Sequence, residues 1–287
     1  MAWGTIIAAY LFLAGVSAGA FLTAVNAPRL WPRGKWEALT KSGILLAIPL
    51  IALGLLLLVF DAEAGLKAPW RFLYLFLNFP GSMMTNGTII ISLYMLVLLY
   101  CGWLVWKKQE LPRWLVTTGN LLALGTAGYT GLLIGVVNTV PLWNTAVLPV
   151  LFLVSALSTG MAAAVITALW LDGGIIGQLQ GMKKVHLGLL IGELILLFFL
   201  VYVTGTSSDV ARQSVDLLLT GKFAALFWGG LIGLGLVLPL LIEWWEMGNA
   251  KHENKALTVL SEVMVLSGGF ILRYLILAAA LPVNLLG

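Results

Sequence analysis

Three ionisable side chains stand inside long apolar stretches of the chain: Glu193, Arg273 and Glu262. A charge within a membrane is costly, and it usually marks a proton or ion pathway or a buried pair. At ~1.5 Å of rise per residue, Glu193 and Arg273 lie about 15 Å from the same side of the membrane and can meet at one level. We expect the three residues to form a proton pathway. The alternatives are a structural ion pair of Glu193 with Arg273, and a Glu262 that extends to the membrane surface.

A second polar group is the phenol of Tyr129, which lies in the glycine-rich run GTAGYTG. A phenol in an apolar environment needs a hydrogen-bond partner. That partner is either a neighbouring helix or the carbonyl of a ring-shaped ligand such as a quinone, for which the glycines leave room. Tyr10 is a similar but weaker case. Asp61 ends the run LLLLVFD and is either a solvated helix end or a group that accepts a proton.

Few residues of the chain can bind a metal or a redox centre. Cys101 is the single cysteine, so neither an intrachain disulfide nor an iron–sulfur cluster is expected. The two histidines, His186 and His252, are too few for a di-haem cytochrome. His186 stands beside Lys183 and Lys184, which is typical of a membrane interface, and one histidine is not a metal site. We therefore expect no haem, no iron–sulfur cluster and no metal in this chain.

The composition indicates which class of protein must hold these residues in place. The 287 residues are 61% hydrophobic and only 10% charged, with a mean hydropathy of +1.02. These values exclude a water-soluble globular protein and a disordered one. The net charge of +4 has an explanation in membrane topology, so nucleic-acid binding is not expected.

The apolar residues are grouped in eight segments, each about as long as the 20 residues that a spanning helix needs. The connections between them are too short for a soluble domain. We therefore expect an all-α integral membrane protein with eight transmembrane helices in a single domain, residues 1–287. The segments cover residues 3–27, 42–60, 84–106, 114–138, 145–171, 184–204, 223–243 and 256–282.

Lys and Arg are distributed unequally between the two sets of connections. Eleven flank one set and four flank the other, and Arg273 is left inside a segment. Because basic residues concentrate on the cytoplasmic side, the first set is expected inside and both termini outside. The first set comprises Arg29, Arg33, Lys35, Lys41, Lys107, Lys108, Arg113, Lys183, Lys184, Lys251 and Lys255.

Two segments resemble each other: FLAGVSAGA from Phe12 and FLVSALSTGMA from Phe152. Each has a serine two residues before a glycine, and the first also contains Gly15 and Gly19 at the spacing that lets membrane helices approach closely. The pattern indicates close packing. A duplication into two four-helix bundles is one arrangement that fits it, and the match is too short to decide.

Several stretches, in order along the chain, resemble the NrfD/polysulfide reductase membrane-subunit family. They are AAYLFLAGVSAGAF at 8–21, GLLLLVFD at 54–61, PWRFLYLF at 69–76, GYTGLLI at 128–134, LPVLFLVSALSTGMAAA at 148–164, IGELILLFF at 191–199 and ILRYLIL at 271–277. The resemblance implies a multi-pass subunit of a bacterial-type cytoplasmic (inner) membrane that binds menaquinone or its quinol near the outer face. It also implies a docked iron–sulfur subunit and, through that subunit, a catalytic subunit.

The resemblance also assigns residues. The polysulfide-reductase branch has a quinone-contacting tyrosine in helix four, which Tyr129 matches, and an acid at the outer end of helix two, which Asp61 matches. Tyr10 and Arg71 are second-tier candidates for the same quinone site, among helices one to four. Where that branch has polar residues early in helix one, this chain has Tyr10 and Ile7, so it is expected to be closer to the nitrite-reductase-type branch. The outer connections 62–83 and 140–144 are apolar and aromatic, and together with the N-terminus of the first helix they are expected to dock the iron–sulfur subunit.

The first functional interpretation is therefore a membrane anchor that exchanges electrons between the menaquinone pool and a docked iron–sulfur subunit, as in anaerobic respiration. A second interpretation, from another class, is a secondary transporter with a midplane site at Glu193 and Arg273. Against it, Pro49 and Pro239 do not fall at corresponding positions of the repeat. A third is a purely structural anchor without quinone chemistry.

Overall fold

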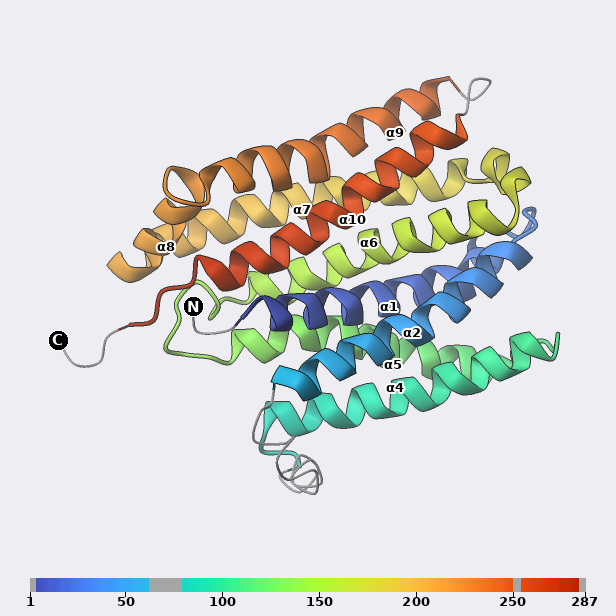
Figure 1. Cartoon of the computed structure of the whole chain (residues 1–287), viewed down its shortest axis with the longest axis horizontal. Helices are drawn as coiled ribbons and strands as arrows, with labels where there is room; N and C mark the ends of the chain where they lie inside the picture. The colour runs from blue at the N-terminus through green and yellow to red at the C-terminus, as the bar shows by residue number, and fades with distance from the viewer. Residues whose placement is uncertain (1–3, 62–78, 250–253, 284–287) are drawn as a thin grey trace.

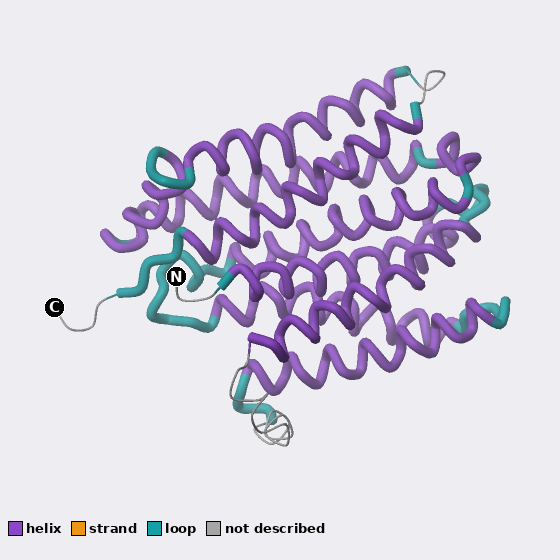
Figure 2. Tube along the Cα trace, in the orientation of Figure 1, coloured by secondary structure: helices purple, strands orange, loops and turns teal. Residues whose placement is uncertain are grey.

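The computed structural model describes residues 4–61, 79–249 and 254–283, and within them the fold is all-helical, without strands (Figure 2). Arg71 and His252 lie outside the described residues. The helices are α1 (Thr5–Leu30), α2 (Glu37–Asp61), α4 (Met83–Trp106), α5 (Arg113–Gly135), α6 (Val147–Leu171), the 3-10 helix η2 (Gly173–Gln178), α7 (Gln180–Ser207), α8 (Asp209–Leu219), the π-helix η3 (Leu226–Val237), α9 (Leu238–Gly248) and α10 (Lys255–Ala278).

Seven helices in the described part of the chain are long and apolar enough to cross a membrane, with η3 and α9 forming one of them. They are α1, α2, α4, α6, α7, η3–α9 and α10. The remaining long helix, α5, has 23 residues, and its threonines, glycines and Asn120 make it less apolar than the others. The all-α membrane fold is confirmed. The count of eight crossings and the outside position of the termini stay predictions.

The long helices run side by side, so the bundle has two ends (Figure 1). One end, here called the basic end, contains the connections 31–36, 107–112 and 172–179 together with the end of α9 and the start of α10. The opposite end, here called the terminal end, contains the start of α1, the end of α10, the connection 136–146 and the short helix α8. Large apolar side chains such as Leu96 and Phe198 are exposed along the bundle, as a lipid-facing surface requires.

The centre of the bundle is formed by α1 and α6, which touch through their backbones. A Cβ at Gly19 would overlap the carbonyl of Ala156, and a Cβ at Gly160 would overlap the backbone of Gly19. These two glycines occupy matching places in the two similar segments, since each follows a serine by two positions: Ser17 and Ser158. The spacing of small residues therefore predicted a real close approach.

The outer segment 140–144, within the connection 136–146, was expected to dock a partner, and the structure corrects part of that expectation. The side chains of Val140, Leu142 and Trp143 are buried within the chain itself. The Trp143 indole Nε1 donates to the carbonyl of Ile276 over 2.7 Å, which ties the connection to α10. These apolar residues are therefore part of the core and are not available to a partner.

Candidate functional site

A chain of buried polar side chains runs between α6, α7 and α10. The guanidinium Nη1 of Arg273 donates to Ser155 Oγ over 3.1 Å and to the carbonyl of Gly269 over 2.8 Å. One turn further along α6, Ser158 Oγ donates to the Glu193 carboxylate over 3.1 Å. Ser155 also interacts with that carboxylate. Within the described residues, Glu193 and Arg273 are therefore linked through two hydroxyls of α6, as well as by their mutual attraction.

The rest of the Arg273 guanidinium is surrounded by aromatic rings. Its Cζ lies 5.2 Å from the ring centroid of Phe152 and 5.7 Å from that of Phe12. A cation over an aromatic face is attracted by the ring quadrupole, most strongly where water is excluded. Phe12 and Phe152 begin the two similar segments of α1 and α6. The repeat thus frames a fully buried arginine.

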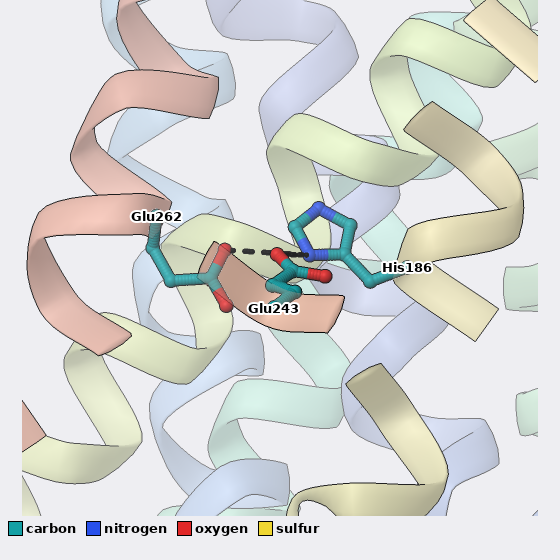
Figure 3. Close-up of side chains that lie close together, drawn as sticks. All are labelled: His186, Glu243 and Glu262. Atoms are coloured by element: carbon teal, nitrogen blue, oxygen red, sulfur yellow. Dashed lines mark ion pairs between the residues drawn. The ribbon is translucent and has the colours of Figure 1, made fainter. Parts of the chain in front are cut away.

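A second polar group lies nearer the basic end, where α7, α9 and α10 meet. His186 Nδ1 lies 2.7 Å from Glu243 Oε1 and 3.5 Å from Glu262 Oε2 (Figure 3). All three side chains are buried, with 1–3% of each residue exposed. We call His186, Glu243 and Glu262 the triad. Two carboxylates at one imidazole nitrogen require a positive charge there, either a proton or a cation.

A third buried carboxylate, Glu246, stands one turn beyond Glu243 on α9. Its Oε2 lies 3.1 Å from Lys183 Nζ, and its Oε1 accepts a hydrogen bond from Thr258 Oγ1 over 2.9 Å. Lys183 is 4% exposed and Glu246 is 1% exposed. This pair joins α7, α9 and α10 beside the triad and supplies one of the positive charges of the region.

The two polar groups approach each other at Ser158. The His186 ring interacts electrostatically with the backbone of Ser158, and the Ser158 hydroxyl binds Glu193, but His186 Nε2 has no hydrogen-bond partner among the described residues. Counted from the basic-end start of α7 at ~1.5 Å per residue, His186 is about 9 Å deep and Glu193 about 20 Å deep. Counted the same way along α10, Arg273 is about 27 Å deep. The polar chain therefore extends well into the apolar bundle from the basic end.

The structure corrects two expectations about these residues. Glu262 does not extend to the membrane surface, because it is buried against His186. His186 is likewise buried at a helix junction, so its side chain does not face the membrane surface. Sequence reasoning missed Glu243 and Glu246. Their signal was the three-residue spacing in IEWWEMG, which puts both acids on one face of the helix.

Tyr129 lies in the terminal half of the bundle and is 5% exposed. Its ring packs on α4 at Gly87, where a Cβ would overlap the ring. Tyr10 on α1 is buried and close enough to Tyr129 to interact electrostatically. Neither hydroxyl has a hydrogen-bond partner among the residues that the structure describes. Two neighbouring phenols without protein partners are suited to bind a ligand with oxygen atoms.

Tyr94 shows what a structural tyrosine looks like in this bundle. Its hydroxyl donates to the carbonyl of Ser17 over 3.0 Å, and Ser17 Oγ donates to the carbonyl of Ala47 over 2.8 Å. These bonds join α1, α2 and α4 in the core. The contrast with Tyr129 and Tyr10 is clear, because the Tyr94 hydroxyl is satisfied by the protein.

Asp61 is exposed at the last residue of α2 and makes no hydrogen bond or ion pair with other described residues. It shares the terminal end with Tyr10 and Tyr129, since α2 packs on α1 where Gly54 contacts Tyr10. The structure therefore brings the two tyrosines together and leaves Asp61 at the surface of the same helices. Arg71 lies outside the described residues.

Comparison with known proteins agrees with this architecture. The sequence model of the family "Polysulphide reductase, NrfD" matches residues 1–283. The protein is 34% identical to the C chain of polysulfide reductase from Wolinella succinogenes, over 96% of its own length and 93% of that relative. It is 31% identical to protein NrfD of Escherichia coli, over 85% of each.

A more distant relative is the C subunit of selenate reductase from Mesobacillus selenatarsenatis, 24% identical over 84% of the present sequence and 66% of that relative. The identities of 34% and 31% do not place this protein nearer to the NrfD branch than to the polysulfide reductase branch. The match over nearly the whole length is decisive at the level of the family: the chain belongs to the NrfD polysulphide reductase family.

Proposed function

We propose that this protein is the quinone- or quinol-binding membrane anchor of a respiratory oxidoreductase complex. It exchanges electrons between the menaquinone pool and an iron–sulfur subunit docked on the outer face. The observation that carries the proposal is family membership over residues 1–283, together with relatives whose names describe single components of polysulfide and selenate reductases. The terminal substrate belongs to the catalytic subunit.

The quinone head group binds at Tyr129 and Tyr10 in this proposal. A quinone presents two carbonyl oxygens that accept hydrogen bonds, and a quinol presents two hydroxyls. The two phenols are close enough to interact electrostatically in the terminal half of the bundle, and neither has a hydrogen-bond partner within the described residues. Tyr129 donates to one carbonyl oxygen. Asp61 accepts or relays a proton at the adjoining surface, and Arg71 is a further candidate contact.

The quinone site also needs a supply of protons, because reduction of a quinone to a quinol consumes two electrons and two protons. The polar chain offers a route for protons from the basic end. In the proposal they pass from Glu262 and His186 through Ser158 to Glu193. Arg273, which contacts Phe12 of α1, stabilises the Glu193 carboxylate from the far side. The serine hydroxyls support this route, because a hydroxyl both donates and accepts hydrogen bonds.

The transporter interpretation is less well supported by the same geometry. Arg273 Nη1 donates to Ser155, Glu193 accepts from Ser158, and the guanidinium is packed between aromatic rings, although its Nε and Nη2 have no hydrogen-bond partner among the described residues. The two cavities found near the ends of α7, each of about 10 Å³, are not lined by Glu193 or Arg273, and neither is large enough for a solute. A transported solute would need such a space at the midplane of the bundle.

The test is to purify the partner subunits with and without this protein. The proposal expects both preparations to reduce or oxidise an artificial soluble dye, because the dye reaches the catalytic subunit directly. Only the preparation with this protein is expected to react with a menaquinol analogue. Equal quinol activity in both preparations would refute the proposal and favour a purely structural anchor.

A further inference from the structure

The triad has the ligand types and spacing of a metal site. His186, Glu243 and Glu262 each offer one ligand atom, and these atoms all lie within 4.8 Å of one another. Bonds of about 2.0–2.2 Å to a tetrahedral Zn²⁺ put ligand atoms about 3.4 Å apart. The separations from His186 Nδ1, 2.7 Å to Glu243 and 3.5 Å to Glu262, bracket that value.

The charges around the triad favour a bound cation over a neutral imidazole. Glu243, Glu246 and Glu262 are three buried carboxylates, and Lys183 is the buried lysine that faces them among the described residues. A neutral His186 would leave two negative charges uncompensated inside the bundle, and a buried unpaired charge is strongly destabilising. A divalent cation at the triad cancels that excess.

Unsatisfied oxygens point to the same place. Within the described ranges, Glu243 Oε2 is fully buried and has neither a hydrogen-bond nor an ion-pair partner. Glu262 Oε2 is buried 3.5 Å from His186 Nδ1, and the two carboxylates converge on that nitrogen (Figure 3). Buried polar atoms without partners are rare in native proteins and indicate an absent ligand or ion.

Two further features suit a metal. A cavity of about 10 Å³ is lined by His186, Glu262 and Lys183 together with Met161 and Met182. This is about the room that one water needs, and a three-ligand zinc site takes a water as its fourth ligand. His186 Nδ1 faces both carboxylates while the other ring nitrogen points away from them, so Nδ1 is the ring atom that would bind the ion (Figure 3).

We propose that His186, Glu243 and Glu262 bind one divalent transition-metal ion of the Zn²⁺ type. The sequence predicted no metal site because His186 stands alone in its segment, whereas the Glu243 and Glu262 carboxylates lie on two other helices, α9 and α10. The consequence for activity rests on the proposed function: an ion at the triad occupies Glu262 and His186 and thereby closes the proton route at the basic end. The site is then inhibitory and reversible.

The experiment uses the intact complex, stripped with a chelator and equilibrated with Zn²⁺ alone. Zinc is counted by elemental analysis, and its ligands are identified by X-ray absorption. We expect the wild type to contain one more zinc ion per protein than the Glu262→Gln or Glu243→Gln variant. We also expect one imidazole among the ligands of that zinc ion. The matched control is Glu246→Gln, which removes a buried carboxylate one turn away on the same helix as Glu243 and should keep the zinc.

Equal zinc content in the wild type and Glu262→Gln would overturn the metal site and leave the proposed function untouched. If neither variant assembles, X-ray absorption of the wild type decides, since zinc without an imidazole ligand refutes the triad. Quinol turnover of the wild type should fall at least about ten-fold with bound zinc and recover with chelator. Bound zinc with unchanged turnover would retain the metal site and refute the passage of protons through Glu262.

Discussion

Replacing Tyr129 by Phe is the sharpest single test of the quinone site. The substitution removes one hydroxyl and keeps the ring that packs on Gly87. The hydroxyl has no partner within the described residues, so its removal should change stability little. A hydrogen bond to a quinone carbonyl contributes about 0.5–1.5 kcal/mol net, so the affinity should fall about 2- to 13-fold.

The assay is steady-state turnover of the assembled complex with a soluble menaquinol analogue, together with the Kd of the bound quinone. The control is Tyr94→Phe, which breaks the hydrogen bond to Ser17 in the core. That variant should lose about 1 kcal/mol or more of stability with the quinone Kd unchanged. A Tyr129→Phe complex with normal stability and wild-type Kd and turnover would refute the reasoning.

Other perturbations test the remaining parts of the account. Asp61→Asn should slow quinol turnover without loss of assembly, because Asp61 is exposed and unpaired among the described residues; turnover equal to wild type would remove it from the site. Glu193→Gln should assemble and turn over slowly if Glu193 relays protons, whereas poor yield in detergent would indicate that it only balances Arg273. Gly160→Val should abolish assembly because its side chain would overlap the backbone of α1, and Gly128→Ala, with open space around its Cβ, should assemble normally when both are compared by thermal stability.

Local patterns predicted the features that depend on one helix or on one pair of similar segments. The glycine spacing around Gly19 predicted close packing, and the structure places Gly19 against α6. Apolar length predicted most of the helices. The glycine-rich setting of Tyr129 predicted room for a ring, although part of that room, at Gly87 on α4, is filled by the tyrosine ring itself.

Features that depend on which helices become neighbours could not be predicted from the sequence patterns. In the sequence, Glu243 and Glu246 are two acids near the end of an apolar segment. They are buried beside Lys183 and His186 because α9 packs against α7 and α10. The level of Glu193 and Arg273 suggested a direct pair, and α6 inserts Ser155 and Ser158 between them. The apolar residues at 140–143 suggested a docking surface, because composition shows that a segment will be covered and not what covers it.

The central claim, a quinone bound at the terminal end of the bundle, is tested most directly by photo-crosslinking. The intact complex is irradiated with a menaquinone analogue that carries an azide on its ring, and the modified peptides are identified by mass spectrometry. The account predicts labelling of α1 near Tyr10 and of α5 near Tyr129, and competition by unlabelled menaquinone. Competable labelling confined to the basic end, or to helices α7 and α9, would contradict it.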